Sequence, residues 1–156
     1  MKQSLCDIAL VEGNNELNVQ MAPLGVVTPW SFSNVQCSIV PSGIGAWPMV
    51  SFSALVTNIG DKQVTKTITQ YRRDYIPVYN PETGGFDWQW GDWAIATTNE
   101  GTVLQYEVTL APGASYQYNS PPPGEHTLIT ADPGTKAECY LADSDGYESA
   151  HCAASV

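Results

Sequence analysis

Apolar and polar residues alternate with a period of two along much of this chain. Val50, Phe52, Ala54 and Val56 alternate with a second, mostly polar set, and the segment from Leu104 to Leu110 repeats the pattern. Such alternation is typical of antiparallel strands that bury one face. No window of helical length carries an apolar stripe with a period of about 3.6 residues. The pattern therefore predicts an all-β protein.

Turn residues separate these strands at regular intervals. Further strands are predicted at 32–40, 64–71 and 126–131, and Tyr116 and Tyr118 share one face of another. Clusters of Gly, Pro, Asn and Asp recur about every 8 to 12 residues, which is the spacing found in sandwiches and barrels. Because the strands, roughly seven to nine of them, differ in length, we predict an open antiparallel β-sandwich rather than a barrel.

The strand pattern divides the chain into three parts. Residues 29–141 form the predicted sandwich, with an insertion at about 74–101, and residues 142–156 form a C-terminal tail. Residues 1–28 form an N-terminal hairpin or arm, because two short apolar runs flank Gly13-Asn14-Asn15. The second run has a face suited to adding a strand to a partner's sheet edge, made by Leu17, Val19 and Met21.

The insertion concentrates aromatic residues. After a loop at 80–85, aromatic residues alternate with polar ones, which predicts a long hairpin with one aromatic face. Tyr75 precedes the loop, and the candidate contact residues are Tyr79, Phe86, Trp88, Trp90 and Trp93.

Three interpretations of these rings are open. In the first they fold against the sheet as a secondary core, since large exposed apolar patches are disfavoured on monomers. In the second they form a protein interface, because Trp and Tyr dominate interface hot spots. In the third they stack on the pyranose faces of a sugar, while Asp87, Gln89 and Asp92 supply hydrogen bonds.

Composition and charge narrow the classes of partner. The 156 residues are 43% apolar and 14% charged, enough for one core, so a single domain is expected. Six basic against sixteen acidic residues give a net charge of -10, which repels phosphate backbones and anionic headgroups. Nucleic acid and membrane surfaces are therefore not expected as partners. The sequence shows no signal peptide and no apolar run long enough to span a bilayer.

The four cysteines do not suggest a zinc site, because none lies in a Cys-x-x-Cys pair. Cys37 alternates with two core candidates, Val35 and Ile39, and is interpreted as a buried, inert thiol. Cys139 and Cys152 flank a tail rich in Gly, Ser and Asp, and a disulfide between them would close the tail as a loop. The alternative is that both stay reduced, as the missing signal peptide suggests.

A set of ordered motifs carries a resemblance to a known family. The motifs are the strand 50–56 running into Thr57-Asn58-Ile59-Gly60-Asp61, the strand ending in Leu110-Ala111-Pro112-Gly113, and the segment 123–128 leading to Asp132-Pro133. Over residues 30 to 139 the chain resembles the bacterial cell-adhesion-related domain CARDB. The resemblance implies an immunoglobulin-like and fibronectin-III-like sandwich that acts as a non-catalytic spacer, attachment or assembly domain. The chain departs from the family at Glu138-Cys139, in its tail and in the aromatic insertion.

Other candidate sites have plain structural interpretations. No glycine-rich phosphate loop or nucleophile elbow is present, and no cofactor is expected. His126 alternates with Leu128 and is interpreted as a packed core residue rather than a general base. The acidic run 143–148 offers carboxylates to a hard cation such as calcium, but it lacks EF-hand spacing and is interpreted as a solvated loop. The pair Arg72-Arg73 is expected to form ion pairs with some of the acids.

Together these features predict a non-catalytic structural or attachment protein. We expect it to act through protein–protein contacts as an accessory component of a larger assembly, such as a decoration (cement) protein of a viral capsid. It is expected to form homo-oligomers or join a hetero-assembly, on a virion or an extracellular surface. The alternative is a cell-surface carbohydrate-binding or adhesion module that uses Trp88, Trp90 and Tyr79.

Overall fold

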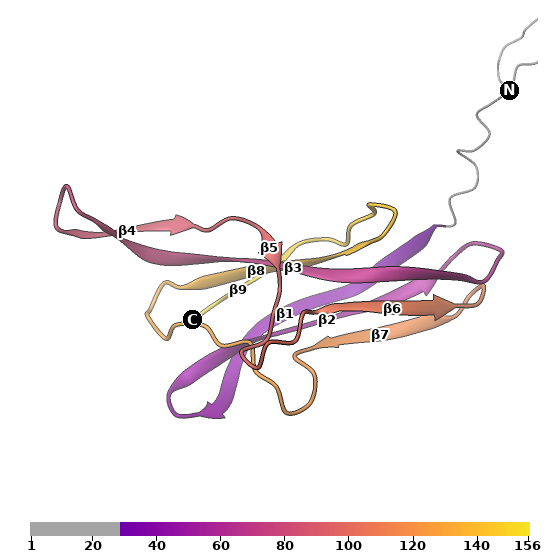
Figure 1. The fold of residues 1–156 in the computed structure, drawn as a ribbon, viewed down its shortest axis with the longest axis horizontal. Helices are drawn as coiled ribbons and strands as arrows, with labels where there is room; N and C mark the ends of the chain where they lie inside the picture. Colours follow the sequence, from indigo (N-terminus) through magenta and orange to yellow (C-terminus); the bar gives the residue numbers. More distant parts are fainter. Residues whose placement is uncertain (1–28) are drawn as a thin grey trace, which may run out of the picture.

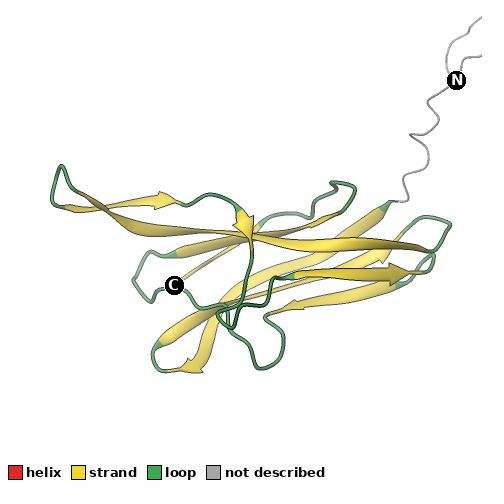
Figure 2. Ribbon diagram, viewed as in Figure 1, coloured by secondary structure: helices red, strands yellow, loops and turns green. Residues whose placement is uncertain are grey.

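The computed structural model describes residues 29–156, which form two antiparallel β-sheets and contain no helix (Figure 2). In chain order the strands are β1 (Trp30–Ile44), β2 (Trp47–Asn58), β3 (Val64–Asn80), β4 (Gly85–Trp90), β5 (Ala94–Ile95), β6 (Gln105–Leu110), β7 (Ser115–Ser120), β8 (Lys136–Asp143) and β9 (Cys152–Ser155). The prediction of an all-β protein is confirmed for this part of the chain. The predicted arm at 1–28, with Leu17, Val19 and Met21, lies outside the described residues.

Strand β3 organises the larger sheet. Its first half is rich in Val, Ile and Thr, which favour a pleated, half-buried surface. One edge of β3 pairs in succession with β6, β5 and β4, and the other edge pairs with β8, which in turn pairs with β9. The smaller sheet has the order β1-β2-β7. The end of β3 and most of β4 extend past the other strands (Figure 1).

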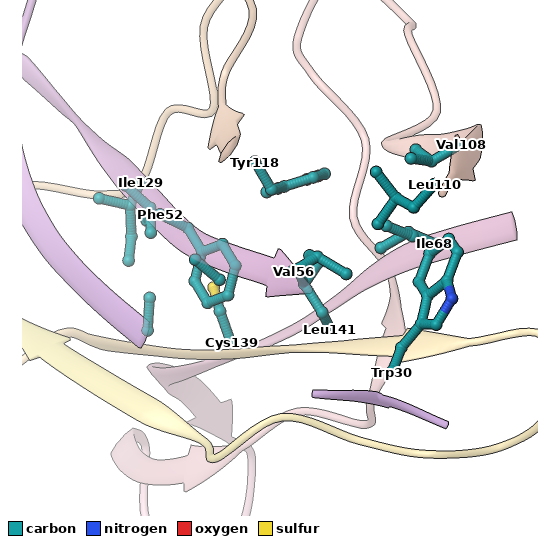
Figure 3. Close-up of a cluster of buried hydrophobic side chains, with 13 residues drawn as sticks. Trp30, Phe52, Val56, Ile68, Val108, Leu110, Tyr118, Ile129, Cys139 and Leu141 are labelled. Carbon is teal, nitrogen blue, oxygen red and sulfur yellow. The ribbon is translucent and has the colours of Figure 1, made fainter. Parts of the chain in front are cut away.

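One hydrophobic core lies between the two sheets (Figure 3). Phe52, Val56 and Tyr118 contribute to it from the smaller sheet, and Ile68 and Leu141 from the larger one. Phe52 meets Tyr118 edge-on, with ring centroids 5.9 Å apart. The alternating apolar residues of β2 are all buried, so the face predicted from the sequence is confirmed.

Residues 126–131 do not form the predicted strand. They join β2 through backbone hydrogen bonds and one isolated bridge. Thr127 and Ile129 are buried, whereas His126 is partly exposed and hydrogen-bonded to Glu100. The interpretation of His126 as a packed core residue is therefore wrong. The buried threonine is tolerated because its hydroxyl donates to a β2 carbonyl at 2.5 Å, a partner that apolar alternation does not reveal.

Residues 142–156 are not a separate tail, because β8 extends to Asp143 and β9 pairs with β8. Cys139 lies opposite Cys152 in this pairing, but the disulfide joins Cys152 to Cys37 of β1, with the Cα atoms 5.9 Å apart. Cys139 is buried and has no disulfide partner among residues 29–156. The expectations of a Cys139–Cys152 bridge and of a free Cys37 are thus both wrong. Cys37 approaches Cys152 from the opposite sheet, so the bridge joins an edge strand of each sheet.

The acidic run 143–148 surrounds a lysine. Lys66 Nζ lies 2.9 Å from Oδ2 of both Asp143 and Asp145, and over the rings of Trp30 and Tyr147. The side chains of Lys66 and Asp143 are 2% and 0% exposed. Oδ1 of Asp143 accepts the backbone N–H groups of Asp145 at 2.9 Å and Tyr147 at 3.1 Å. The interpretation as a solvated loop is wrong for Asp143, because the turn folds around a buried ammonium group from β3.

Candidate partner-binding surface

The hairpin predicted at the insertion is present and projects beyond the sheets (Figure 1). Strand β3 pairs with β4 from Tyr75 to Asn80, but its pairing with β8 ends where Tyr75 lies opposite Lys136. Beyond this point β3 and β4 form a two-stranded ribbon, residues 76–90, which pairs with no further strand in the described part of the chain. We refer to residues 76–90 as the ribbon.

A short loop closes the ribbon at the predicted position. The backbone carbonyl of Asn80 accepts the N–H of Gly84 at 2.9 Å, and its side-chain oxygen accepts the N–H of Glu82 at 2.8 Å. The Asn80 amide donates to Asp87 Oδ2 at 2.6 Å. Gly84 has a φ of 75°, in the left-handed region that glycine enters without steric cost. These local bonds fix the register that brings the rings of both strands to one face.

That face carries a row of aromatic rings. Tyr75 lies opposite Trp90 and Tyr79 opposite Phe86, with ring centroids 5.2 and 5.7 Å apart. Trp88 stacks on Tyr75 at 5.7 Å. Trp88 and Trp90 are each 36% exposed, whereas Tyr79 is 58% and Phe86 67% exposed. The row is therefore packed at its root and open at its tip.

Trp93 belongs to a packed cluster at the root of the ribbon. Its ring meets Tyr140 edge-on at 4.8 Å and His151 at 5.2 Å, and Tyr140 stacks on His151 at 4.3 Å. The Arg73 guanidinium lies over both Trp90 and Trp93, 4.6 and 4.7 Å from the ring centroids. Burial in this cluster raises the pKa of the Tyr140 phenol. The rings at the root thus pack as a small secondary core, in contrast to the rings at the tip.

The polar residues expected to assist a sugar site lie on the opposite face. Asp87 and Gln89 alternate with the aromatic residues of β4, so their side chains point away from the aromatic row. Val78 and Ile76 lie directly opposite them in β3 and share their face. Ile76 also lines a hollow of about 360 Å³ together with Trp47. The ribbon therefore carries apolar side chains on both faces.

Some ring faces at the root are already covered. Arg73 lies over Trp90, and Lys136 Nζ lies 5.4 Å from the ring centroid of Tyr75. Gly134 lies so near Trp88 that an added Cβ would be 3.4 Å from its ring. A pyranose needs an open ring face on which to stack, so these contacts restrict sugar stacking to the tip.

The prediction that Arg72 and Arg73 form ion pairs is confirmed. Arg72 donates to both carboxylate oxygens of Asp74 at 2.8 and 2.9 Å, and Arg73 donates twice to Glu138 Oε1 at 3.0 and 2.8 Å. The Arg73 pair fixes the guanidinium over the tryptophans and so belongs to the root of the ribbon.

The described histidines contact glutamates. His126 Nδ1 lies 2.9 Å from Glu100 Oε2, and this hydrogen bond lowers the pKa of Glu100. His151 lies 3.5 Å from Glu138 and 3.6 Å from Glu148. Between residues 29 and 156, no serine, threonine or cysteine side chain hydrogen-bonds to either ring, and no cluster of potential ligands suits a metal ion. The same residues include no helix that could cross a membrane.

Comparisons with known proteins return distant structural similarity alone. No family model matches the chain, and no curated protein matches it. The sporulation control protein Spo0M from Bacillus subtilis is similar over 83% of this chain and 50% of that chain, with 11% identity and a TM-score of 0.45. The putative ApaA protein from Bordetella pertussis is similar over 81% of this chain and 94% of that chain, with 15% identity and a TM-score of 0.37. This chain thus spans half the length of the Spo0M chain.

Proposed function

We propose that this protein is a non-catalytic attachment protein, built on an immunoglobulin-like sandwich, that holds a protein partner with the ribbon. The observation that carries the proposal is the projection of residues 76–90 beyond the sheets with apolar side chains on both faces. A two-stranded hairpin without further packing is marginally stable in water. Exposed aromatic residues in such a position are typical of interaction sites. A partner that covers the ribbon would stabilise it and remove this apolar surface from water.

A protein partner accounts for the ribbon better than a sugar. The most exposed rings, Tyr79 and Phe86, are tilted by 49° to each other and do not form one flat platform. The hydrogen-bonding residues Asp87 and Gln89 lie on the other face of the ribbon. A protein groove can contact both faces and the backbone edge at once, which a sugar stacked on one face cannot do.

The assembly that we propose is a larger particle decorated by this protein, such as a viral capsid, which places it on a virion or an extracellular surface. An attachment role is also what the resemblance to CARDB implies. The Cys37–Cys152 disulfide supports a location outside the reducing cytosol, because structural disulfides persist in oxidising environments.

The proposal is tested with a Tyr79→Ser/Phe86→Ser double variant, which changes the open tip and leaves the packed root intact. Ile59→Ser is the matched control, because Ile59 is equally exposed but lies in a turn outside the ribbon. The full chain and both variants are used to capture partners from the source cells or particles, and each partner is then purified and its affinity measured directly.

The tip variant should weaken binding of the purified partner by roughly 30-fold, since removing hot-spot rings costs about 2 kcal/mol or more. The control should bind as the unchanged chain does. Equal affinity of the tip variant and the unchanged chain would refute the proposal. A tryptophan fluorescence shift with oligosaccharides, abolished by the tip variant, would instead favour the carbohydrate-binding alternative.

A further inference from the structure

The edge of β4 that faces away from β3 has backbone groups available to pair with another strand. The backbone carbonyl of Asp74 accepts the backbone N–H of Gly91 at 2.8 Å. Asp74 and Gly91 are therefore a hydrogen-bonded pair in the register that continues along β3 and β4. Such pairs alternate with non-hydrogen-bonded pairs along an antiparallel ladder. The backbone N–H and C=O groups of Phe86, Trp88 and Trp90 therefore point away from β3. Within residues 29–156 no strand pairs with this edge.

The opposite edge of the ribbon is unsuited to strand addition. By the same alternation, the backbone groups of Pro77 point to the free edge of β3, beyond the end of β8. Proline has no N–H to donate there, and it blocks pairing where a sheet edge must stay free. The ribbon thus offers one edge for pairing, and that edge carries the aromatic strand.

We infer that this edge pairs with the same edge of a second copy of the chain, antiparallel, about a two-fold axis at Trp88. The inference rests on the proposed function, because it makes the ribbon an interaction surface and names its partner. An antiparallel pair keeps these outward groups opposite each other whether the axis lies at an outward residue or at a residue between two of them. An axis at Trp88 pairs all five residues from 86 to 90 with their counterparts, whereas an axis at any of the other four pairs part of the strand with the flanking glycine residues. An axis at Asp87 would also place two carboxylates directly opposite each other.

The side chains of β4 are complementary to themselves in this register. Phe86 lies opposite Trp90 of the second copy, so the two aromatic rows join into one across the new sheet. On the other face Asp87 lies opposite Gln89 of the second copy, where an amide can donate to the carboxylate. No like charges oppose each other, which is the cross-strand arrangement that stabilises a pair. The sequence of β4 is thus nearly symmetric in its chemistry about Trp88.

The net charge of the chain sets how the association depends on salt. Each copy carries a charge of -10, and Glu82, Asp87 and Asp92 lie on or beside the ribbon. Two such surfaces repel each other at low ionic strength, and added salt screens the repulsion. Association should therefore strengthen with salt, in contrast to a dimer held by ion pairs.

The test measures dimerisation of the full chain by sedimentation equilibrium, for the unchanged chain and for two charge variants at position 89. Gln89→Lys places an ammonium opposite Asp87 of the second copy and should tighten the dimer by roughly fivefold. Gln89→Asp places two carboxylates opposite each other and should weaken it by a similar factor. The same substitutions at Gln36, an exposed glutamine of β1, are the matched controls and should leave the dimer unchanged.

A cysteine pair tests the register itself. Trp88→Cys brings two cysteines together at a hydrogen-bonded pair, where the Cα atoms are about 5.5 Å apart and a disulfide can form. Position 87 is exposed as position 88 is, but the two cysteines of Asp87→Cys lie diagonally, about 7 to 8 Å apart, beyond easy disulfide reach. Trp88→Cys should form covalent dimers on mild oxidation, and Asp87→Cys should not.

The inference is overturned if the unchanged chain and Gln89→Lys both remain monomeric at high concentration and high salt. It is also overturned if a dimer forms with the same affinity whatever residue stands at position 89. In either case, loss of a different partner by the Tyr79→Ser/Phe86→Ser variant would leave the proposed function standing. A dimer that responds to position 89, in a protein whose partner binding ignores the ribbon tip, would support the inference and refute the broader attachment role.

Discussion

Replacing Lys66 with methionine tests the buried ion pair that joins β3 to the end of β8. Methionine keeps the length and apolar stem of the side chain but removes the ammonium, and it leaves the carboxylate of Asp143 buried without its partner. Removing one member of a buried ion pair costs about 3 to 5 kcal/mol. This cost applies because the side chains of Lys66 and Asp143 are both buried, at 2% and 0% exposed. Asp145 is 42% exposed and remains hydrated. Since domains are stable by about 5 to 15 kcal/mol, the loss is a large share of the total.

Urea unfolding followed by tryptophan fluorescence measures this loss. Lys62→Met is the matched control, because Lys62 is exposed in the preceding turn and its replacement should change the free energy of unfolding by less than about 0.5 kcal/mol. Adding Asp143→Asn to Lys66→Met should recover part of the loss, since asparagine is neutral and still accepts the N–H groups of Asp145 and Tyr147. A loss below about 1 kcal/mol in Lys66→Met, or no recovery in the double variant, would refute this account of the ion pair.

The same variant has a defined pH dependence. Burial on its own lowers the pKa of Lys66, but hydrogen bonds and charge attraction from Asp143 and Asp145 outweigh it and raise the pKa above its ordinary value of 10.5. A raised pKa contributes stability that is fully present below the pKa of the unfolded chain and is lost as the pH rises through the folded pKa. The difference in unfolding free energy between the unchanged chain and Lys66→Met should therefore narrow above pH 10.5. A difference that stays constant into that range would contradict the pairing.

Two further predictions concern the thiols and the root of the ribbon. Cys139 should resist thiol reagents in the native protein, because burial raises its pKa to about 11, and after unfolding without reductant, peptide mapping should find the label on Cys139 and not on Cys37. Label on Cys37 would contradict the observed pairing. Gly134→Ala should lower the free energy of unfolding less than Gly124→Ala, because both positions have positive φ but only at Gly134 does the new Cβ gain van der Waals contact with the Trp88 ring. Equal losses in urea unfolding would show that this ring does not pack there.

Strand faces could be predicted from the sequence because they depend on neighbouring residues alone. In β2 the alternation identified the buried set from Val50 to Val56. In β7 it predicted that Tyr116 and Tyr118 share one face, and both pack against the core. The hairpin loop at 80–85 was predicted for a similar reason, since Asn80 and Gly84 form its turn through local bonds. Period and turn chemistry act over a few residues, and one sequence suffices to read them.

Pairings between distant residues could not be predicted in the same way. Cys152 lies in the same sheet as Cys139 but bonds to Cys37, which is 115 residues away in the sequence. Choosing between a Cys139–Cys152 and a Cys37–Cys152 bridge requires knowing which strands of the two sheets lie next to each other. The alternation of apolar and polar residues does not show this. The environment of the acidic run 143–148 could not be predicted for the same reason. Its composition does not show that the Lys66 side chain of β3 lies against its carboxylates. A buried charge needs an oppositely charged partner, and Lys66 and Asp143 are far apart in the sequence.

The ribbon depends both on local sequence patterns and on pairing between distant segments. Its rings, turn and alternation are local, so Tyr79, Phe86, Trp88 and Trp90 were found from the sequence, while Trp93 was grouped with them although it packs at the root. How far the ribbon projects depends on where β8 begins to pair with β3, because β8 accompanies β3 only as far as the level of Tyr75 and Lys136. A β8 that began several residues earlier would lie beside the second half of β3, and the ribbon would then be part of a three-stranded sheet. The length of β3 beyond this pairing is thus the feature that presents the aromatic strand on a free two-stranded projection, and it depends on the pairing of two segments that are far apart in the sequence.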